Sequence, residues 1–364
     1  MALLPWELAS DGVKKPTGIL LSPRRGTSAL LRLGRAVTDA DTWHEAYWTA
    51  IDEAPASECL GLVARIGDGA GEWRMKPVAV RQDRGSRKTQ DVEAIARFDG
   101  WVYLIGSQYG RPGGPLESRR SFLARFREPI GAPTKAVRME VVRDRFRLHR
   151  AINDALAVSR LPLAPLSEKA SHDFIHRTRI LGRRRHKAWA DRILPGDLPL
   201  NIEGATFDDQ GGLVLGLRFP VTASGHPIIV ELKGLDGAFR SAGWWPVVQA
   251  IRIVNGAGSP GVPTGIRDLE LSGDELHLLV GGIDPELVKG APPPSSRSFE
   301  HRIGRWSRGE ATSSLPTRLV RRFPPGQRVE GLAGDGTGGF AYVAERLPGV
   351  DRPAKGRVAV LSLT

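Results

Sequence analysis

The stretch NIEGATFDDQGGLVLGLRFP, residues 201–220, decides the fold. It has the pattern of a short apolar strand, a turn rich in Asp and Gly, and a second apolar strand. A carboxylate, Glu203, interrupts the apolar start of the first strand. Because charged groups are rarely buried alone, the role of this residue bears on both fold and function.

Three further stretches of the chain repeat this pattern. They are DVEAIARFDGWVYLIGSQYG from Asp91, GIRDLELSGDELHLLVGGID from Gly265 and VEGLAGDGTGGFAYVAERLP from Val329. A fifth, degenerate copy begins at Ser28 and has AYWTAIDE as its second strand. The chain is therefore a repeat protein.

The spacing of the copies predicts a ring. The intervals between equivalent positions are 64, 110, 64 and 63 residues, counted at Ser28, Val92, Ile202, Ile266 and Val329. Passing from Val329 through the termini back to Ser28 adds another 63. A repeat that closes through its own termini is expected of a ring of blades, whereas the end repeats of a solenoid cap the array.

We therefore predict an all-β fold, a closed β-propeller that spans residues 1–364 as one domain. Each unit contains two more apolar segments, which gives four antiparallel strands per blade. The prediction is five motif-bearing blades, or six if the long interval contains a blade without the motif. The last unit has only three strands, and TGILLS at residues 17–22 is expected to supply its outer strand.

The long interval contains a segment with helical periodicity. Residues 144–194 carry apolar side chains at helical spacing with Arg and His between them, and Ser167 is a suitable helix start. We predict a basic α-helical insert between blades. His172 and His176 lie four residues apart, but a zinc peptidase motif requires Glu beside the first His and a third ligand, and Asp173 stands there instead.

The composition indicates a soluble cytoplasmic protein. One cysteine, Cys59, excludes an internal disulfide, and the start of the chain lacks the basic and apolar regions of an export signal. The longest apolar runs are too short to cross a membrane. No nucleophile elbow, P-loop or dinucleotide fingerprint occurs. The Gly-rich stretch GDGTGG at residues 334–339 falls at a hairpin turn, whereas a phosphate-binding loop should lead into a helix.

The formal net charge of +12 is concentrated in the insert. Residues 138–192 contain 14 Lys or Arg and 6 Asp or Glu, an excess of 8. This uneven distribution argues against nucleic acid as the general partner. The basic face of the insert could bind an acidic protein, nucleic acid or nothing, and a small acidic or polar ligand is a further candidate partner. Trp244 and Trp245 could stack on such a ligand or pack beneath a loop.

The recurring carboxylate predicts a charged ring on one face of the propeller. The equivalent positions hold Glu93, Glu203, Arg267 and Glu330, each at the start of an innermost strand. Antiparallel pairing brings the ends of the second strands to the same face. The residues expected there are Asp52, Glu53, Ser107, Arg218, Asp284 and Glu345.

Three chemical interpretations of this ring remain open. Glu93, Glu203 and Glu330 could hold Ca²⁺ or Mg²⁺. Ca²⁺ takes about six to eight oxygen ligands, and either bound ion could activate a water molecule. Alternatively, the Glu and Arg groups could form ion pairs that join the blades, since buried charges must pair. In the third interpretation they bind a polar ligand without reaction.

The motifs DVEAIA, YLIGSQYG, NIEGA, GIRDLEL and VEGLAGD together resemble those of a bacterial family of unknown function with propeller-like repeats. They are also distantly similar to the esterase-like domain of phytase-related propellers, whose repeats share an E-G-L or E-G-A start. The resemblance implies a β-propeller with Glu93, Glu203, Arg218, Arg267, Asp268 and Glu330 at family positions. Phytase-type propellers hold calcium with clustered acidic residues, and this chain has single carboxylates instead.

The sequence leaves open whether the protein is an enzyme. It favours a binding or scaffold module that uses the charged ring and the basic insert. The alternative is a metal-assisted phosphoester or ester hydrolase, phytase-like or lactonase-like, with Glu93, Glu203 and Glu330 as ligands.

Overall fold

The structure is a computed structural model, and it describes residues 27–34, 43–51, 54–66, 72–82, 89–129, 136–291, 297–307, 312–324, 327–336, 338–346 and 358–363. Five sheets follow one another along the chain. The first sheet contains β1 (Thr27–Arg32), β2 (Trp43–Ile51), β3 (Leu60–Ile66) and β4 (Glu72–Pro77). The second contains β6 (Val92–Phe98), β7 (Trp101–Gly106), β8 (Leu123–Arg127), β9 (Val137–Val142) and, at its outer edge, β5 (Val80–Gln82).

The remaining three sheets complete the β structure. The third contains β10 (Asn201–Phe207), β11 (Leu213–Phe219), β12 (Ile228–Lys233), β13 (Val247–Asn255) and β17 (Thr312–Pro316). The fourth contains β14 (Thr264–Ser272), β15 (Glu275–Gly282), β16 (Ser298–Ile303) and β18 (Arg318–Arg322). The fifth contains β19 (Gln327–Gly334), β20 (Phe340–Arg346) and β21 (Val358–Leu363).

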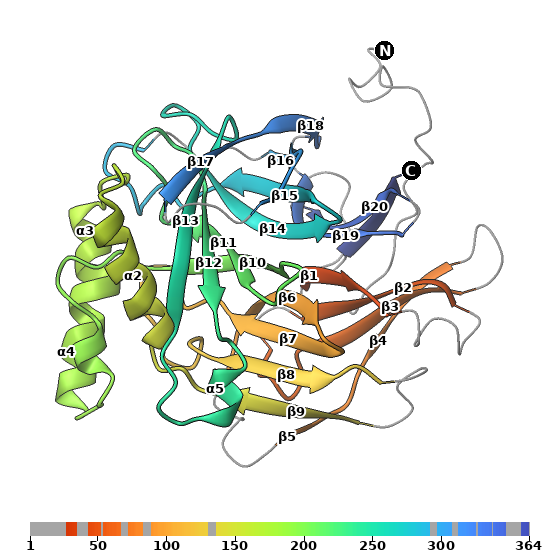
Figure 1. The fold of residues 1–364 in the computed structure, drawn as a ribbon. Coiled ribbons are helices and arrows are strands. Elements are labelled where there is room, and N and C mark those ends of the chain that lie inside the picture. The colour runs from red at the N-terminus through yellow and green to blue at the C-terminus, as the bar shows by residue number, and fades with distance from the viewer. Residues whose placement is uncertain are drawn as a thin grey trace.

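The sheets are arranged as the blades of a β-propeller. The innermost strands β1, β6, β10, β14 and β19 lie around the centre of the molecule, and the later strands of each sheet lie further out (Figure 1). Each innermost strand contacts the next, and β19 contacts β1. Four of the sheets have four or five strands, and the fifth has three among the described residues. The fourth strand expected from residues 17–22 lies outside the described part of the chain.

Two short strands that the sequence pattern did not predict are added to the sheets, and each pairs parallel to its neighbouring strand. β5 pairs with β9 of its own sheet, and β17 pairs with β13 of the preceding sheet. Both cover an outer edge that would otherwise expose unpaired backbone groups.

The helices lie between β9 and β10 in the chain and beside β12 and β13 in space (Figure 1). They are α2 (Arg147–Ser159), α3 (Glu168–Ala170), the π-helical turn η3 (Ser171–His176), α4 (Arg177–Arg184) and the 3₁₀ turn η4 (Ala190–Arg192), and a separate short helix α5 (Gly237–Arg240) precedes β13. Ser167 accepts a hydrogen bond from the N–H of Ala170 at 3.1 Å and so begins α3 as an N-cap. No helix within the described ranges is long and apolar enough to span a membrane.

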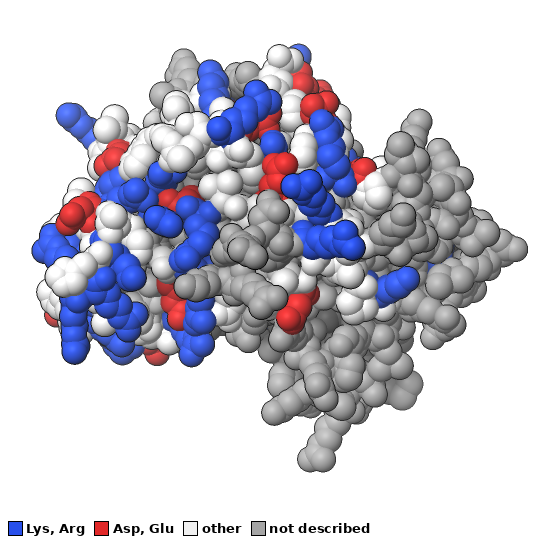
Figure 2. Space-filling view, turned by 90° about the horizontal axis from the view of Figure 1, so that it is seen from below, with Lys and Arg blue, Asp and Glu red and all other residues white. Residues whose placement is uncertain are grey.

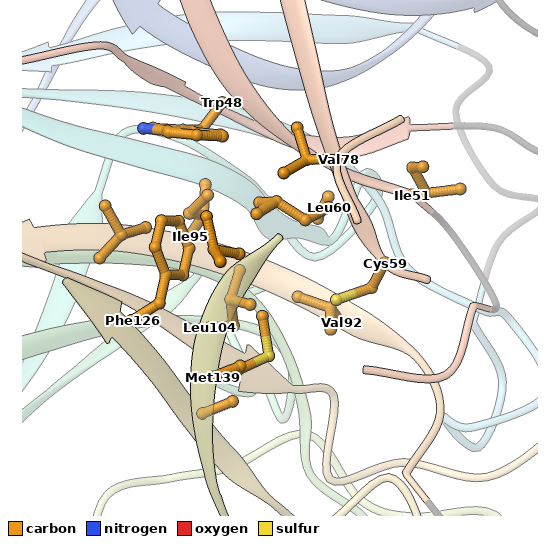
Figure 3. Close-up of a cluster of buried hydrophobic side chains, with 14 of the residues drawn as sticks. Trp48, Ile51, Cys59, Leu60, Val78, Val92, Ile95, Leu104, Phe126 and Met139 are labelled. Atoms are coloured by element: carbon orange, nitrogen blue, oxygen red, sulfur yellow. The ribbon is translucent and has the colours of Figure 1, made fainter. Parts of the chain in front are cut away.

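Apolar side chains between neighbouring sheets form the core. Between the first and second sheets, Trp48 and Phe126 meet edge to face with ring centroids 5.3 Å apart, and Leu60, Ile95 and Leu104 fill the space around them (Figure 3). This packing fixes the angle between blades, and therefore the positions of their innermost strands.

Candidate functional site at the strand bulges

The recurring position is a β-bulge in all five innermost strands, and it holds a charged residue in four of them. In the third sheet, Ile202 pairs with Leu217 and Gly204 pairs with Gly216, so Glu203 has no partner on β11. The same register shift occurs once in each of the other innermost strands, and the bulged residues are Ser28, Glu93, Glu203, Arg267 and Glu330. A bulge redirects a side chain away from strict alternation. This explains how an acidic residue fits at the beginning of a buried strand.

Three blades are joined by ion pairs at this level, in a group that we call the bulge cluster: Glu203, Arg218, Arg267, Arg328 and Glu330. The Arg267 Nη1 lies 2.8 Å from Glu330 Oε2 and 3.3 Å from Glu203 Oε2, so it connects β14 with strands on both sides. Arg218 Nη1 lies 2.6 Å from Glu203 Oε1, and Arg328 pairs with Glu330. These contacts are of the kind that the second interpretation describes, in which Glu and Arg groups form ion pairs between blades.

The bulge cluster controls the charge of its own members. Although burial disfavours the charged form, Arg218 and Arg267 lower the pKa of Glu203 below its usual value. Burial also opposes the charge of Arg218, but Glu203 and Glu330 raise its pKa. Burial and the nearby Arg218 lower the pKa of Arg267. Since each charge depends on its neighbours, removal of one member leaves a buried charge without compensation.

A second ionic group lies at the beginning of β6. Asp91 has a left-handed backbone (φ 73°), and its carboxylate accepts from Ser107 Oγ and pairs with Arg120 Nη1, both at 2.6 Å. Burial raises the pKa of Asp91, and its side chain also hydrogen-bonds Glu93. The sequence predicted Ser107 and Glu93 on this face but missed Asp91 and Arg120, which lie 29 residues apart.

Directly after each bulge, the innermost strands carry small residues, with one exception. The five positions hold Ala29, Ala94, Gly204, Asp268 and Gly331. A Cβ on Gly331 would lie 3.0 Å from the backbone N of Leu30, so this glycine allows β19 to approach β1 closely.

Asp268 is the exception, and it fastens neighbouring strands. Its carboxylate accepts from the N–H of Leu269 at 2.8 Å and of Leu332 on β19 at 2.9 Å, and it also receives a backbone hydrogen bond from Leu30 on β1. Burial raises the pKa of Asp268 well above its usual value. Asp268 therefore links three blades through their backbone amides.

The remaining residues predicted for the charged ring are Asp284, Glu345, Asp52 and Glu53. Asp284 accepts a hydrogen bond from the N–H of Glu286 at 2.9 Å and raises the pKa of nearby Tyr109, after the larger effect of burial. The backbone of Glu345 belongs to β20, while its side chain lies outside the described part of the structure. Asp52 and Glu53 also lie outside it.

Two of the glutamates predicted to hold Ca²⁺ or Mg²⁺, Glu203 and Glu330, both contact Arg267. Arg267 lies between Glu203 and Glu330, so a guanidinium occupies the place of the expected cation. Across the described ranges, no group of three or more His, Cys, Asp or Glu has a geometry that could hold a metal ion. In the insert, His172 and His176 have ring centroids 5.5 Å apart without a third ligand in those ranges.

Further along β14, Glu270 has an altered acidity. It accepts from the N–H of Gly334 at 2.6 Å. Burial raises its pKa to about 7, against opposing effects of Gly334, His277, Arg97 and Arg32. The folded protein thus holds this proton more tightly than the unfolded chain does. Its contribution to stability is greatest below the usual carboxyl pKa and decreases as the pH rises toward 7.

Glu270→Gln is expected to remove this pH dependence. Gln keeps an oxygen acceptor for Gly334 but cannot ionise, so the variant should exceed the wild type above pH 7 by about 1–3 kcal/mol and match it near pH 4. Urea unfolding at both pH values measures the difference. Glu286→Gln, at a side chain that is 67% exposed, is the control. Equal stability differences at both pH values would contradict the prediction.

Comparisons with known proteins concern the fold alone. No protein-family model matches the sequence, and no curated protein matches it. Among solved structures, the Bacteroides ovatus "Xyloglucan PUL GH43B" protein is 10% identical, with 96% of this chain and 54% of that chain covered and a TM-score of 0.45. The Clostridium thermocellum α-L-arabinofuranosidase CtGH43 is 10% identical, with 94% and 91% covered and a TM-score of 0.41.

A third solved structure belongs to a different class of protein. The PQQ-bound aldose sugar dehydrogenase of Streptomyces coelicolor is 11% identical, with 97% and 100% covered and a TM-score of 0.38. The chain spans 54% to 63% of the length of three of the structures it matches, the Bacteroides ovatus protein among them. None of these similarities supports the expected link to the esterase-like domain of phytase-related propellers.

Proposed function

We propose that the protein is a closed ring of five blades that acts as a binding module for an acidic ligand or protein surface. Support for the ring comes from the five sheets, from the contact between β19 and β1, and from the bulge that recurs in every innermost strand. In this proposal the bulge cluster holds the blades together, because its charged groups already pair with one another.

The observation that carries the binding proposal is the exposed basic surface of the insert. Arg184, Arg185 and Lys187 at the end of α4 are all exposed. Figure 2 shows Lys and Arg gathered on the side of the molecule where Figure 1 places the helices. A concentrated positive surface attracts anionic partners and speeds their association.

Charge reversal of this surface tests the proposal. The wild type is expected to bind polyglutamate with an affinity that falls as salt rises, and the triple change of Arg184, Arg185 and Lys187 to Glu should weaken binding at least about tenfold. The matched control reverses Lys233, Arg318 and Arg322, which are exposed elsewhere. An equal loss in both variants would show that only net charge matters and would overturn the proposal.

The alternative is a metal-assisted phosphoester or ester hydrolase. The observation in its favour is Asp91, a buried acid with raised pKa and left-handed backbone, which interacts electrostatically with Glu203. Strained residues with altered acidity often occur at active sites. Near-stoichiometric calcium or magnesium in the purified protein, lost in Glu203→Ala, together with phosphoester or lactone hydrolysis, would establish this alternative in place of the binding module.

A further inference from the structure

Four arginines lie near one another at the junction of the propeller and the helices, and one of them, Arg192, lies over the exposed Trp245. We call this group the arginine cluster: Arg143, Arg145, Arg147, Arg192 and Trp245. Arg143 and Arg145 belong to the segment that joins β9 to α2, and Arg147 begins α2. Arg192 ends η4, and Trp245 precedes β13. Residues from three separate parts of the chain therefore converge on one surface.

Hydrogen bonds connect the three chain segments that carry the arginine cluster. The Arg192 Nη1 donates to the backbone oxygen of Arg145 at 2.7 Å and to that of Asp144 at 3.3 Å. The Arg192 guanidinium lies over the Trp245 ring, 5.8 Å from its centroid. On the other side, Arg147 Nη2 donates to the backbone oxygen of Ala242 at 2.7 Å, in the loop that contains Trp245.

The arginine cluster has an excess of positive charge. Among the residues that the structure describes, none of its four guanidinium groups forms an ion pair with a carboxylate. Asp144, which precedes Arg145 in the chain, is fully buried, and Ser121, Gln108 and the N–H of Phe146 donate to its carboxylate. Burial, and then the repulsion of Arg145, lower the pKa of Arg143. Burial and then Arg147 lower the pKa of Arg192, against an opposing effect of Asp144.

This arrangement differs from that of other arginines in the same region. Arg125 pairs with Glu140 and Asp236, both at 2.8 Å, and Arg150 pairs with Asp197 at 2.7 Å. The backbone at the cluster is also costly, because Arg145 and Phe146 are consecutive non-glycine residues with φ of 55° and 66°. The left-handed turn marks this place as strained. The repulsion between its positive charges is what an anionic ligand would offset.

We propose that the arginine cluster binds a nucleoside phosphate, with the phosphate on Arg145, Arg147 and Arg192 and the base on Trp245. The inference goes beyond the proposed function, because it names a ligand class for a group of residues other than Arg184, Arg185 and Lys187. Several guanidinium groups match the multiple charges and the oxygen geometry of a phosphate. The Trp245 side chain is 44% exposed, and an exposed indole next to Arg offers a stacking surface for a planar base.

Calorimetric titration of the full chain with AMP and with pyrophosphate tests this assignment. Arg145→Ala is expected to weaken both ligands by about tenfold or more, because it removes a phosphate contact. Trp245→Ala should weaken AMP by about tenfold and leave pyrophosphate unchanged, because only AMP has a base to stack. The control is Arg240→Ala, at a side chain that is 75% exposed and paired with Asp236 at 3.2 Å; it should change neither affinity.

The outcomes separate this inference from the proposed function. Absence of AMP binding, or an AMP affinity that is insensitive to Trp245→Ala, would overturn the nucleotide assignment. Retained polyglutamate binding in that case would leave the binding-module proposal intact. A single-stranded oligonucleotide distinguishes the two sources of the ligand. Equal affinities for AMP and oligonucleotide identify a free nucleotide, and much tighter oligonucleotide binding through the same residues identifies a nucleic acid strand.

Discussion

Replacing Arg267 by methionine is expected to lower the free energy of unfolding by about 3–5 kcal/mol, the range for breaking a buried ion pair. Arg267 is the only described cation that contacts both Glu203 and Glu330, and its side chain is 7% exposed. Methionine preserves the approximate length of the side chain but leaves both carboxylates short of compensation. Urea denaturation of the variant and the wild type at neutral pH measures the loss.

Two comparisons isolate the electrostatic part of this effect. Arg240→Met removes an exposed arginine with a single carboxylate partner and should cost less than about 1 kcal/mol. Adding Glu330→Gln to Arg267→Met should recover part of the lost stability, because one uncompensated charge disappears. A loss for Arg267→Met as small as that for Arg240→Met would mean that the bulge cluster does not hold the blades together.

Asp268→Ala is the second change with a large expected effect, a loss of about 4 kcal/mol. The alanine cannot accept hydrogen bonds from the backbone of Leu269, Leu332 and Leu30, and these N–H groups are buried between blades. An unsatisfied buried donor costs about 1–3 kcal/mol. Thermal and urea unfolding of the purified variant would give the loss directly.

Asp268→Asn provides the graded comparison. Asparagine keeps one oxygen acceptor but turns an amide donor toward the backbone N–H groups. The free energy of unfolding of Asp268→Asn should therefore lie between those of the wild type and the alanine variant. Asp154→Ala, at a side chain that is 60% exposed, is a surface control. If asparagine proved as damaging as alanine, acceptance of hydrogen bonds by Asp268 would not explain its stabilising role.

The repeat in the sequence predicted the blades and part of the charged ring. Alignment of Glu203 with Arg267 and Glu330 placed them on one face, where the structure joins them. The repeat places equivalent residues at equivalent positions in successive blades, and the strands that carry them are neighbours in space. The bulge itself was not predictable, since Glu203 in an apolar strand does not reveal which residue lacks a partner.

Other features depend on contacts that no local pattern contains. Asp268 was expected to be a site residue, but its hydrogen bonds to backbone N–H groups leave no mark in the sequence of β19 or β1. Arg145 and Arg192 are separated by 47 residues, and only the packing of η4 against α2 brings them together. The short strands β5 and β17 lack alternation over a length that would identify them.

The position of β17 makes the third and fourth sheets one mechanical unit. This strand lies between β16 and β18 in the chain, yet it hydrogen-bonds to β13 in the neighbouring sheet. Separating the fourth sheet from the third would therefore require breaking the hydrogen bonds between β17 and β13. Amide protons in these two sheets should exchange with solvent in the same opening event, rather than blade by blade.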